Sequence, residues 1–320
     1  MMRKNIMLGC ISILLYSPLT MAMQPLDDEI LSNTTGQDGI NIGLGVSKIE
    51  LKQASIIDND GISTGSDYKG RASLVLAGQT NTPVSINLVG ANANPSISTI
   101  IDTDGGGGKP FANIGISIAQ NITGIKISPF SIYVASATST SDAVNNKSIY
   151  ATTGTLNADV KKILNIGSAS NNFEIAFHNT NKPGLNVQLG NVPQSHMLAF
   201  SGAIQSICGT GSGCPISIVS DTTSASFNFQ LQANNPTTGF RLDQFHAGIE
   251  KGGVVFGNYG LNATDKITSD KVDVALNNVM LGDAGVSDPN IFNGIKNGSM
   301  GNIGAVGASI TNLKVRISGL

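Results

Sequence analysis

The sequence predicts an all-β protein, mostly antiparallel, built as an elongated sandwich or as stacked twisted sheets. Three observations predict this class. Short runs that alternate apolar and polar residues recur along the chain, and a period of two is typical of half-buried strands. Clusters of Asp, Asn, Gly and Pro separate these runs. Charged residues make up only 12% of the chain, a composition that suits a polar but uncharged surface. Such runs include Ile114/Ile116/Ile118, Phe173/Ile175/Phe177, Leu185/Val187/Leu189 and Val272/Val274/Leu276.

Residues 1–22 are predicted to be a signal peptide. Arg3 and Lys4 supply the positive start, an apolar run from Leu8 to Leu19 follows, and Ala22 ends a small-residue cleavage site. We therefore expect export across the inner membrane to the periplasm, the outer cell surface or an extracellular filament. No later run approaches the ~18 apolar residues of a membrane-spanning helix, so no transmembrane span is expected.

A short amphipathic helix followed by a turn is predicted for residues 23–39. Asp27, Asp28 and Glu29 crowd its first turn, where the helix dipole favours carboxylates, and Gly36 suits its end. Two to three turns of helix are too short to persist alone in water, so this segment is expected to dock on another surface. Its apolar side consists of Leu26, Ile30 and Leu31.

Residues 40–320 are predicted to form the β-rich body, and a division into two subdomains near residues 140–155 stays open. The first strand alternates from Ile40 to Val46, and the apolar parity then slips at Ile49. Such a slip indicates a bulge, a bend or a change of sheet. An Asn-Ile-Gly triplet recurs at residues 41, 113 and 302, which makes an irregular β-solenoid the alternative architecture.

Cys208 and Cys214 enclose the segment Gly-Thr-Gly-Ser-Gly and are predicted to form a disulfide. In an oxidising compartment two cysteines so close in sequence are expected to pair. A metal or redox pair is the alternative. It lacks support because no histidine lies nearby in the sequence and the spacing is not C-x-x-C.

The sequence predicts neither an enzyme nor a cofactor site. No G-x-S-x-G elbow, zinc motif or phosphate-binding loop is present. The densest acidic cluster, formed by Asp265, Asp270 and Asp273, is expected to solvate a strand edge rather than to supply the paired acids of a secreted enzyme. The formal charge of −2 also excludes nucleic acid as an expected partner, because phosphate binding requires a basic surface.

Metal ligands are sparse in the sequence. His178, His196 and His246 stand far apart, and each is expected to be a surface or strand residue. Two Asp-x-Asp-Gly turns are weak candidates for calcium, although an Asx turn explains the same residues. Their carboxylates belong to Asp58, Asp60, Asp102 and Asp104.

The segment Leu26–Leu31, L-D-D-E-I-L, and the segment Thr35–Ile40, T-G-Q-D-G-I, carry a family resemblance. Together they resemble the start of the mature chain in secreted gammaproteobacterial proteins of the Fil type, known from Acinetobacter. The resemblance covers residues 26–40. It implies a secreted cell-surface or filament-associated protein of a pilus system, with no known enzymatic activity and no catalytic residues to carry over.

The predicted function is therefore structural or adhesive. Alternating strands near both ends of the body, at residues 40–46 and 313–317, can add to the open sheet edge of another subunit. Expected partners are other surface or pilus subunits, with a chaperone or secretion factor. A periplasmic or surface module that binds a glycan or an apolar ligand is the alternative. The assembly candidates are Leu26, Ile30, Leu31, Ile40, Ile42, Leu44 and Val46.

Overall fold

Every helix or strand in the described part of the chain is a β-strand, which confirms the all-β class. The computed structural model describes residues 39–62, 70–91, 95–136, 148–220, 223–260, 262, 264–287 and 294–319. The signal peptide and the helix predicted for residues 23–39, with Leu26, Ile30 and Leu31, lie outside these residues. The chain divides into two units, residues 1–40 and residues 41–320, and all the described strands lie in the second unit except for Ile40, the first residue of β1.

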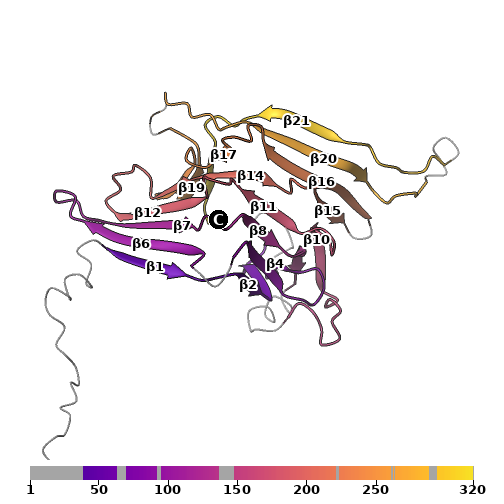
Figure 1. Ribbon diagram of the computed structural model, residues 1–320. Helices are drawn as coiled ribbons and strands as arrows, with labels where there is room; N and C mark the ends of the chain where they lie inside the picture. The colour runs from indigo at the N-terminus through magenta and orange to yellow at the C-terminus, as the bar shows by residue number, and fades with distance from the viewer. Residues whose placement is uncertain are drawn as a thin grey trace, which may run out of the picture. The chain divides into compact units, whose positions relative to one another are not determined.

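Twenty-two strands follow one another along the described residues (Figure 1). No helix among those residues has the length and apolar character to cross a membrane. The strands are β1 (Ile40–Leu44), β2 (Lys48–Leu51), β3 (Gln53–Asp58), β4 (Ala72–Gly78), β5 (Val84–Val89), β6 (Ile97–Asp104), β7 (Phe111–Ile118), β8 (Gly124–Ile127), β9 (Phe130–Ala135), β10 (Val160–Ile166), β11 (Phe173–Phe177), β12 (Gly184–Gly190), β13 (Leu198–Ser201), β14 (Ala203–Ile207), β15 (Cys214–Ser220), β16 (Thr223–Ala233), β17 (Phe240–Arg241), β18 (His246–Glu250), β19 (Gly253–Gly257), β20 (Val272–Leu281), β21 (Ile303–Ala308) and β22 (Lys314–Ile317).

These strands group into eight consecutive arms that run back and forth as one antiparallel meander. Each of arms 1 to 6 carries three strands in sequence, and arms 7 and 8 carry two each. Successive arms are neighbours in the sheets, unlike the stacked coils of a solenoid. The arms span residues 40–58, 72–104, 111–135, 160–190, 198–220, 223–250, 253–281 and 303–317.

The first sheet takes one strand from every arm. Its eight strands follow the order β1-β6-β7-β12-β13-β18-β19-β22, which is the order of arms 1 to 8. Every pairing with a defined register in this sheet is antiparallel. As a result, the first and last strands of the body, β1 and β22, form its two outer edges.

The second sheet contains the other fourteen strands in two bands. The middle band runs β2-β5-β8-β11-β14-β17, and the distal band runs β3-β4-β9-β10-β15-β16-β20-β21. The bands join because β16 pairs with both β14 and β15. The distal band again follows the order of arms 1 to 8, so its outer edges are β3 and β21.

Tight turns reverse the chain between arms. In the turn between β6 and β7, Gly106, Gly107 and Gly108 all have positive φ. Residues with a Cβ rarely adopt this conformation, so the glycine run allows the reversal. The connection between β6 and β7 is therefore a hairpin.

The hydrophobic core lies against one face of the distal band. Val75, Ala77, Tyr133 and Ala135 alternate with outward-facing residues on β4 and β9 and are buried. Ile149 and Tyr150, from the segment after arm 3, pack against them. Val160, which follows this segment, belongs to the same cluster, so residues on both sides of positions 140–155 share one core.

Candidate functional site

One face of the first sheet is aliphatic across seven strands. Residues directly opposite each other in a sheet share a face, so the printed registers define cross-strand rows. One such row consists of Ile101, Ile114, Val187, Leu198, Ala247, Phe256 and Val315. Beside this row and on the same face lie Ile249 and Ile317, which are 70% and 66% exposed. The aliphatic face of the first sheet is therefore wide and incompletely covered.

The distal band has an aliphatic face of the same kind. Ile56, Leu74 and Val134 lie side by side and border a shallow hollow of about 280 Å³. Ile56 is 74% exposed. The neighbouring row crosses seven strands at Ala54, Leu76, Ile132, Leu164, Ile218, Ala225 and Leu281. Both sheets therefore present aliphatic surface to solvent.

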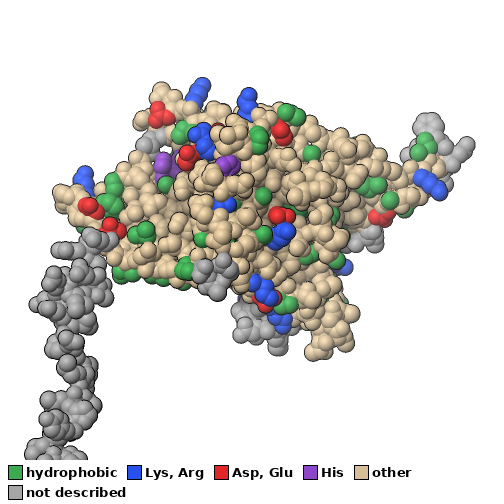
Figure 2. All heavy atoms as spheres, in the orientation of Figure 1, with side chains coloured by type: hydrophobic (Ala, Val, Ile, Leu, Met, Phe, Trp, Pro, Cys, Tyr) green, Lys and Arg blue, Asp and Glu red, His purple; other side chains and the backbone are tan. Residues whose placement is uncertain are grey.

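The opposite face of the first sheet is mainly polar, whereas the opposite face of the distal band carries the buried core at β4 and β9. On the first sheet, Asn186 Nδ2 donates to Asn113 Oδ1 at 2.8 Å and to Gln194 Oε1 at 2.7 Å, and Gln188 Nε2 donates to Asn113 Oδ1 at 3.0 Å. These bonds satisfy half-buried and buried amides without charge. Charged side chains are also few on the face shown in Figure 2. The first sheet is thus amphipathic, and its polar side carries amides together with the ion pairs of Glu250 with Lys314 and Arg316.

The outer edges of the first sheet are exposed strands. Every residue of β1 and of β22 is exposed. Of the residues that the sequence singles out for assembly, Ile40, Ile42 and Leu44 lie in β1. Val46 follows it, and its backbone N–H donates to Ser96 Oγ at 3.0 Å. The C-terminal strand predicted at residues 313–317 is β22.

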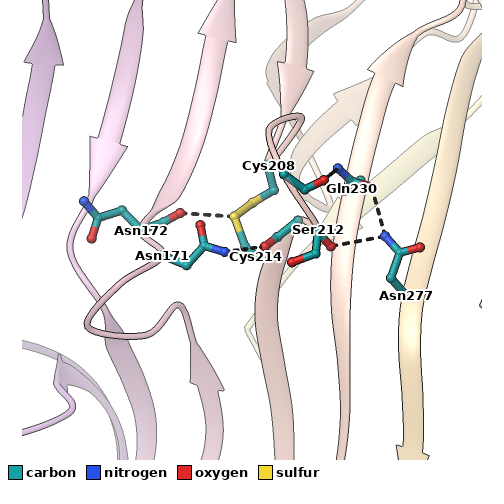
Figure 3. Close-up of a disulfide and its surroundings, with 9 residues drawn as sticks. Asn171, Asn172, Cys208, Ser212, Cys214, Gln230 and Asn277 are labelled. Atoms are coloured by element: carbon teal, nitrogen blue, oxygen red, sulfur yellow. Dashed lines mark hydrogen bonds between the residues drawn. A yellow bond between two sulfur atoms is a disulfide. The ribbon is translucent and has the colours of Figure 1, made fainter. Parts of the chain in front are cut away.

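Cys208 and Cys214 form a disulfide, as the sequence predicts, and both side chains are buried. Figure 3 shows how polar side chains from three other segments hold the loop that it closes. Asn171 Nδ2 donates to the Gly213 carbonyl at 2.7 Å, and Asn277 Nδ2, on β20, donates to the Ser212 carbonyl at 3.1 Å. The disulfide therefore fixes a loop that contacts several arms.

Replacing both cysteines by serine is expected to lower the free energy of unfolding by about 2 kcal/mol, because a small ring removes little loop-closure entropy. Denaturant titration of the oxidised protein and the double variant measures this difference. As a control, Asn171→Ala removes only one hydrogen bond to the loop and should cost about 1 kcal/mol. Equal midpoints for oxidised and reduced protein would contradict a stabilising disulfide.

Two histidines that lie 50 residues apart in the sequence meet on the polar face of the first sheet. The rings of His196 and His246 stack with centroids 3.3 Å apart, and the Tyr259 ring lies edge-on at 4.4 Å from His246. Beside them is a pocket of about 340 Å³ whose lining includes His196, Tyr259, Glu250 and Lys314. No local spacing in the sequence predicts this cluster, because its members lie far apart along the chain.

Burial and positive neighbours control the electrostatics of this cluster. Burial, the His196 ring and the Lys314 ammonium lower the pKa of His246 to about 4. The His246 Nε2 is buried and has no hydrogen-bond partner among the described residues. Lys314 Nζ donates to Glu250 Oε1 at 2.7 Å and lies 4.5 Å above the Tyr259 ring. The hydrogen bond from Lys314 lowers the pKa of Glu250.

The stacked histidines are unsuited to bind one metal ion together. Imidazole donates to a metal through a lone pair in the ring plane, and the planes of these two rings are only 13° from parallel. Within the described residues, no group of three or more His, Cys, Asp or Glu side chains could hold a metal. His178 lies elsewhere, with Nε2 3.0 Å from the Thr237 carbonyl oxygen.

The calcium candidates occupy two separate turns. Asp58 Oδ1 accepts hydrogen bonds from the backbone N–H groups of Asp60 and Gly61 at 3.1 and 3.0 Å, which is an Asx turn and lowers the pKa of Asp58. In the second turn, Asp102 Oδ1 accepts from the Thr103 N–H at 2.7 Å and Asp104 Oδ1 from the Gly106 N–H at 2.5 Å. These backbone bonds account for the acidic residues of both turns.

The acidic cluster of the sequence divides among different partners. Asp270 forms a bidentate pair with Arg241 at 2.9 and 3.0 Å, and the hydrogen bond from Arg241 lowers the pKa of Asp270. Asp273 Oδ1 accepts from Asn234 Nδ2 at 2.9 Å, and Asp265 Oδ2 accepts from the Asn262 N–H at 3.2 Å. Each carboxylate thus has a local structural partner.

Comparisons with known proteins leave the chain without an identified relative. No protein-family model matches it, and comparisons with curated proteins and with solved structures find no similar chain. The functional interpretation therefore depends on the residues and geometry described above.

Proposed function

We propose that this chain is an exported, non-enzymatic structural or adhesive protein of the cell surface, which works by associating with other surface or pilus subunits. The observation that carries the proposal is the pair of apolar cross-strand rows described above, beside which Ile56, Ile249 and Ile317 are mostly exposed. Monomeric soluble proteins rarely leave contiguous apolar patches larger than a few hundred Å² open to water. Burying these faces against a partner is therefore favourable.

Two further features support this proposal. The leader predicted for residues 1–22 and the Cys208–Cys214 disulfide both suit an oxidising compartment outside the cytoplasm. The resemblance of residues 26–40 to Fil-type pilus-system proteins fits the same place. A chaperone or secretion factor would shield the aliphatic faces until assembly.

Assembly is expected to be sensitive to charge on the aliphatic face. Ile249→Lys should reduce the assembled fraction of the exported protein at least about tenfold, because burying an unpaired ammonium is costly. Analytical ultracentrifugation and negative-stain microscopy measure this fraction. Ile295→Lys is the matched control: Ile295 is 65% exposed but lies outside the strands, so assembly should not change.

Two outcomes would contradict the proposed function. One is a wild-type protein that remains monomeric at every concentration and salt condition tested. The other is equal assembly by the two lysine variants.

A small-ligand binding module is the second candidate function. The pocket beside the stacked His196 and His246 favours it, because it combines aromatic surfaces with one carboxylate and one ammonium. Aromatic faces with a few polar groups are typical of sites for glycans and other small ligands. This function is compatible with an adhesive role at the cell surface.

A further inference from the structure

We propose that copies of this chain join head to tail through their sheet edges, with arm 8 of one copy pairing with arm 1 of the next. This inference rests on the proposed function and names its partner, a second copy of the same chain. It would continue the antiparallel meander from copy to copy. Four features of the described strands lead to it.

The first feature is strand direction. Successive arms alternate in direction, so arm 8 runs opposite to arm 1. Arm 8 of one copy can therefore lie beside arm 1 of an identically oriented copy as an antiparallel neighbour. Figure 1 shows β1 beside β6 and β21 beside β20, each at the border of its sheet. Because the number of arms is even, arm 8 of one copy and arm 1 of the next are antiparallel, as neighbouring arms are within the chain.

The second feature is the direction of the free backbone groups. On β1, the Leu44 carbonyl accepts from the Ser96 N–H at 2.8 Å and so points toward β6. Alternation then turns the N–H and C=O groups of Asn41 and Gly43 away from β6. On β22, the Asn258 N–H donates to the Leu313 carbonyl at 3.0 Å. By the same alternation, Lys314 and Arg316 point their backbone groups away from β19.

The third feature is that, at both edges, the residues whose backbone groups point away from the sheet have their side chains on the same face. Ser98 Oγ donates to Asn41 Oδ1 at 3.0 Å, which places Asn41 on the polar face of the first sheet. Lys314 lies on that face as well, because it belongs to the cross-strand row of Asn186 and His246. On both edges, the residues with free backbone groups are therefore the polar-face residues.

This match decides what faces what in the joined sheet. Directly opposite residues of an antiparallel pair share a face. Hydrogen-bonding Asn41 and Gly43 to Lys314 and Arg316 therefore keeps the aliphatic side chains of β1 on the same face as those of β22. If the outward-bonding residues lay on the polar face at one edge and on the aliphatic face at the other, every pairing register would mix aliphatic and polar side chains on one face. The aliphatic face instead becomes continuous from copy to copy.

The fourth feature is that the distal band offers the same pair of edges. Its outer strands are β3, which belongs to arm 1, and β21, which belongs to arm 8. Both are exposed over most of their length, and Val306 of β21 is 83% exposed. One head-to-tail contact between arms therefore brings two pairs of free edges together. Long exposed edges left unpaired would favour uncontrolled aggregation.

Charge disfavours one twofold alternative. Pairing arm 8 with arm 8 of another copy would place Lys314 and Arg316 opposite Lys314 and Arg316, and like charges directly opposite in a sheet destabilise it. In the head-to-tail arrangement the same cations face the uncharged Asn41 and Gly43. Such a heterologous contact repeats from copy to copy and extends into a ladder of copies when its rotation does not close a ring.

Paired cysteines test this geometry in the exported full chain. Under mild oxidation, Asn41→Cys combined with Lys314→Cys or with Arg316→Cys should give a ladder of covalent multimers on a non-reducing gel. Asn41→Cys combined with Val315→Cys is the matched control, because Val315 lies on the other face of the same strand. We expect at least about tenfold less multimer from this control.

A backbone variant tests the edge hydrogen bonds directly. Asn41→Pro removes the outward N–H of β1, whereas Asn41→Ala loses the same side chain and keeps the N–H. The proline variant should lower the assembled fraction about tenfold relative to the alanine variant, as loss of one well-made hydrogen bond would. Circular dichroism of the monomer fraction verifies that both variants fold.

The outcomes separate this inference from the function on which it rests. Equal yields of multimer from cysteines at positions 314, 315 and 316 would overturn the edge pairing and leave surface association standing. Equal assembly by the proline and alanine variants would have the same consequence. If the single variant Asn41→Cys gives cross-linked dimers and no larger multimers form, two copies meet through a twofold β1 contact, and the head-to-tail pairing is overturned. A wild-type chain that never associates would overturn both proposals.

Discussion

Tyr133→Ala is expected to lower the free energy of unfolding by about 4 kcal/mol, the largest single-residue effect in the described chain. The Tyr133 ring is fully buried between β4 and the segment after arm 3, and it lies edge-on to Tyr150 with centroids 6.2 Å apart. Its hydroxyl lies 3.0 Å from the Gly78 carbonyl oxygen and 2.7 Å from the Tyr150 hydroxyl. Truncation therefore leaves a cavity and disrupts a buried polar group. Urea denaturation followed by circular dichroism measures the loss.

Tyr133→Phe is the matched control for this prediction. It keeps the ring and removes only the hydroxyl, so it should cost about 1 kcal/mol. The remaining Tyr150 hydroxyl still lies 2.6 Å from the Gly78 carbonyl oxygen. A Tyr133→Ala loss no larger than that of Tyr133→Phe would show that the ring does not hold this core together.

Acidification from pH 7 to pH 4 is expected to destabilise the protein, with about 3 kcal/mol of the loss due to His246. The folded-state pKa of His246 is about 4, below the ~6.5 of an unfolded chain, because the ring is buried beside His196 and Lys314. The unfolded state therefore binds the proton first as the pH falls. The contribution is fully present above pH ~6.5 and is lost as the pH drops toward 4.

Free energies of unfolding measured across this pH range for the wild type and for His246→Gln test this prediction. The variant has no imidazole at this position, so its stability should fall less steeply between pH 6.5 and 4. Parallel pH profiles for the two proteins would contradict it. Loss of the His196 stack in the variant changes its stability at pH 7, which is why the slopes are compared.

The sequence pattern predicted the kind of structure because alternation reports burial directly. Leu74 and Val75 differ by one position, and they lie on the exposed and buried faces of β4, as a period of two requires. The parity slip between Val46 and Ile49 also has a structural counterpart. Arm 1 leaves the first sheet after Leu44 and enters the second at Lys48.

Long-range relations were beyond the sequence pattern. The Asn-Ile-Gly triplets at Asn41 and Asn113 lie in β1 and β7, which are equivalent positions of arms 1 and 3, whereas the triplet at Asn302 leads into β21. Two of the three triplets therefore mark equivalent positions in the arms of a meander. Strand periodicity alone cannot distinguish such arms from the coils of a solenoid. The stack of His196 on His246 depends on the pairing of β13 with β18, a contact that no local spacing encodes.

Amide hydrogen exchange of the assembled protein tests the head-to-tail meander most directly. The backbone N–H groups of Asn41 and Arg316 face away from their own sheet, so they should exchange rapidly in the monomer and at least about a hundredfold more slowly in the assembly. The Ile42 amide, which points toward β6, should be protected in both states. Equally fast exchange of Asn41 and Arg316 in monomer and assembly would contradict the account.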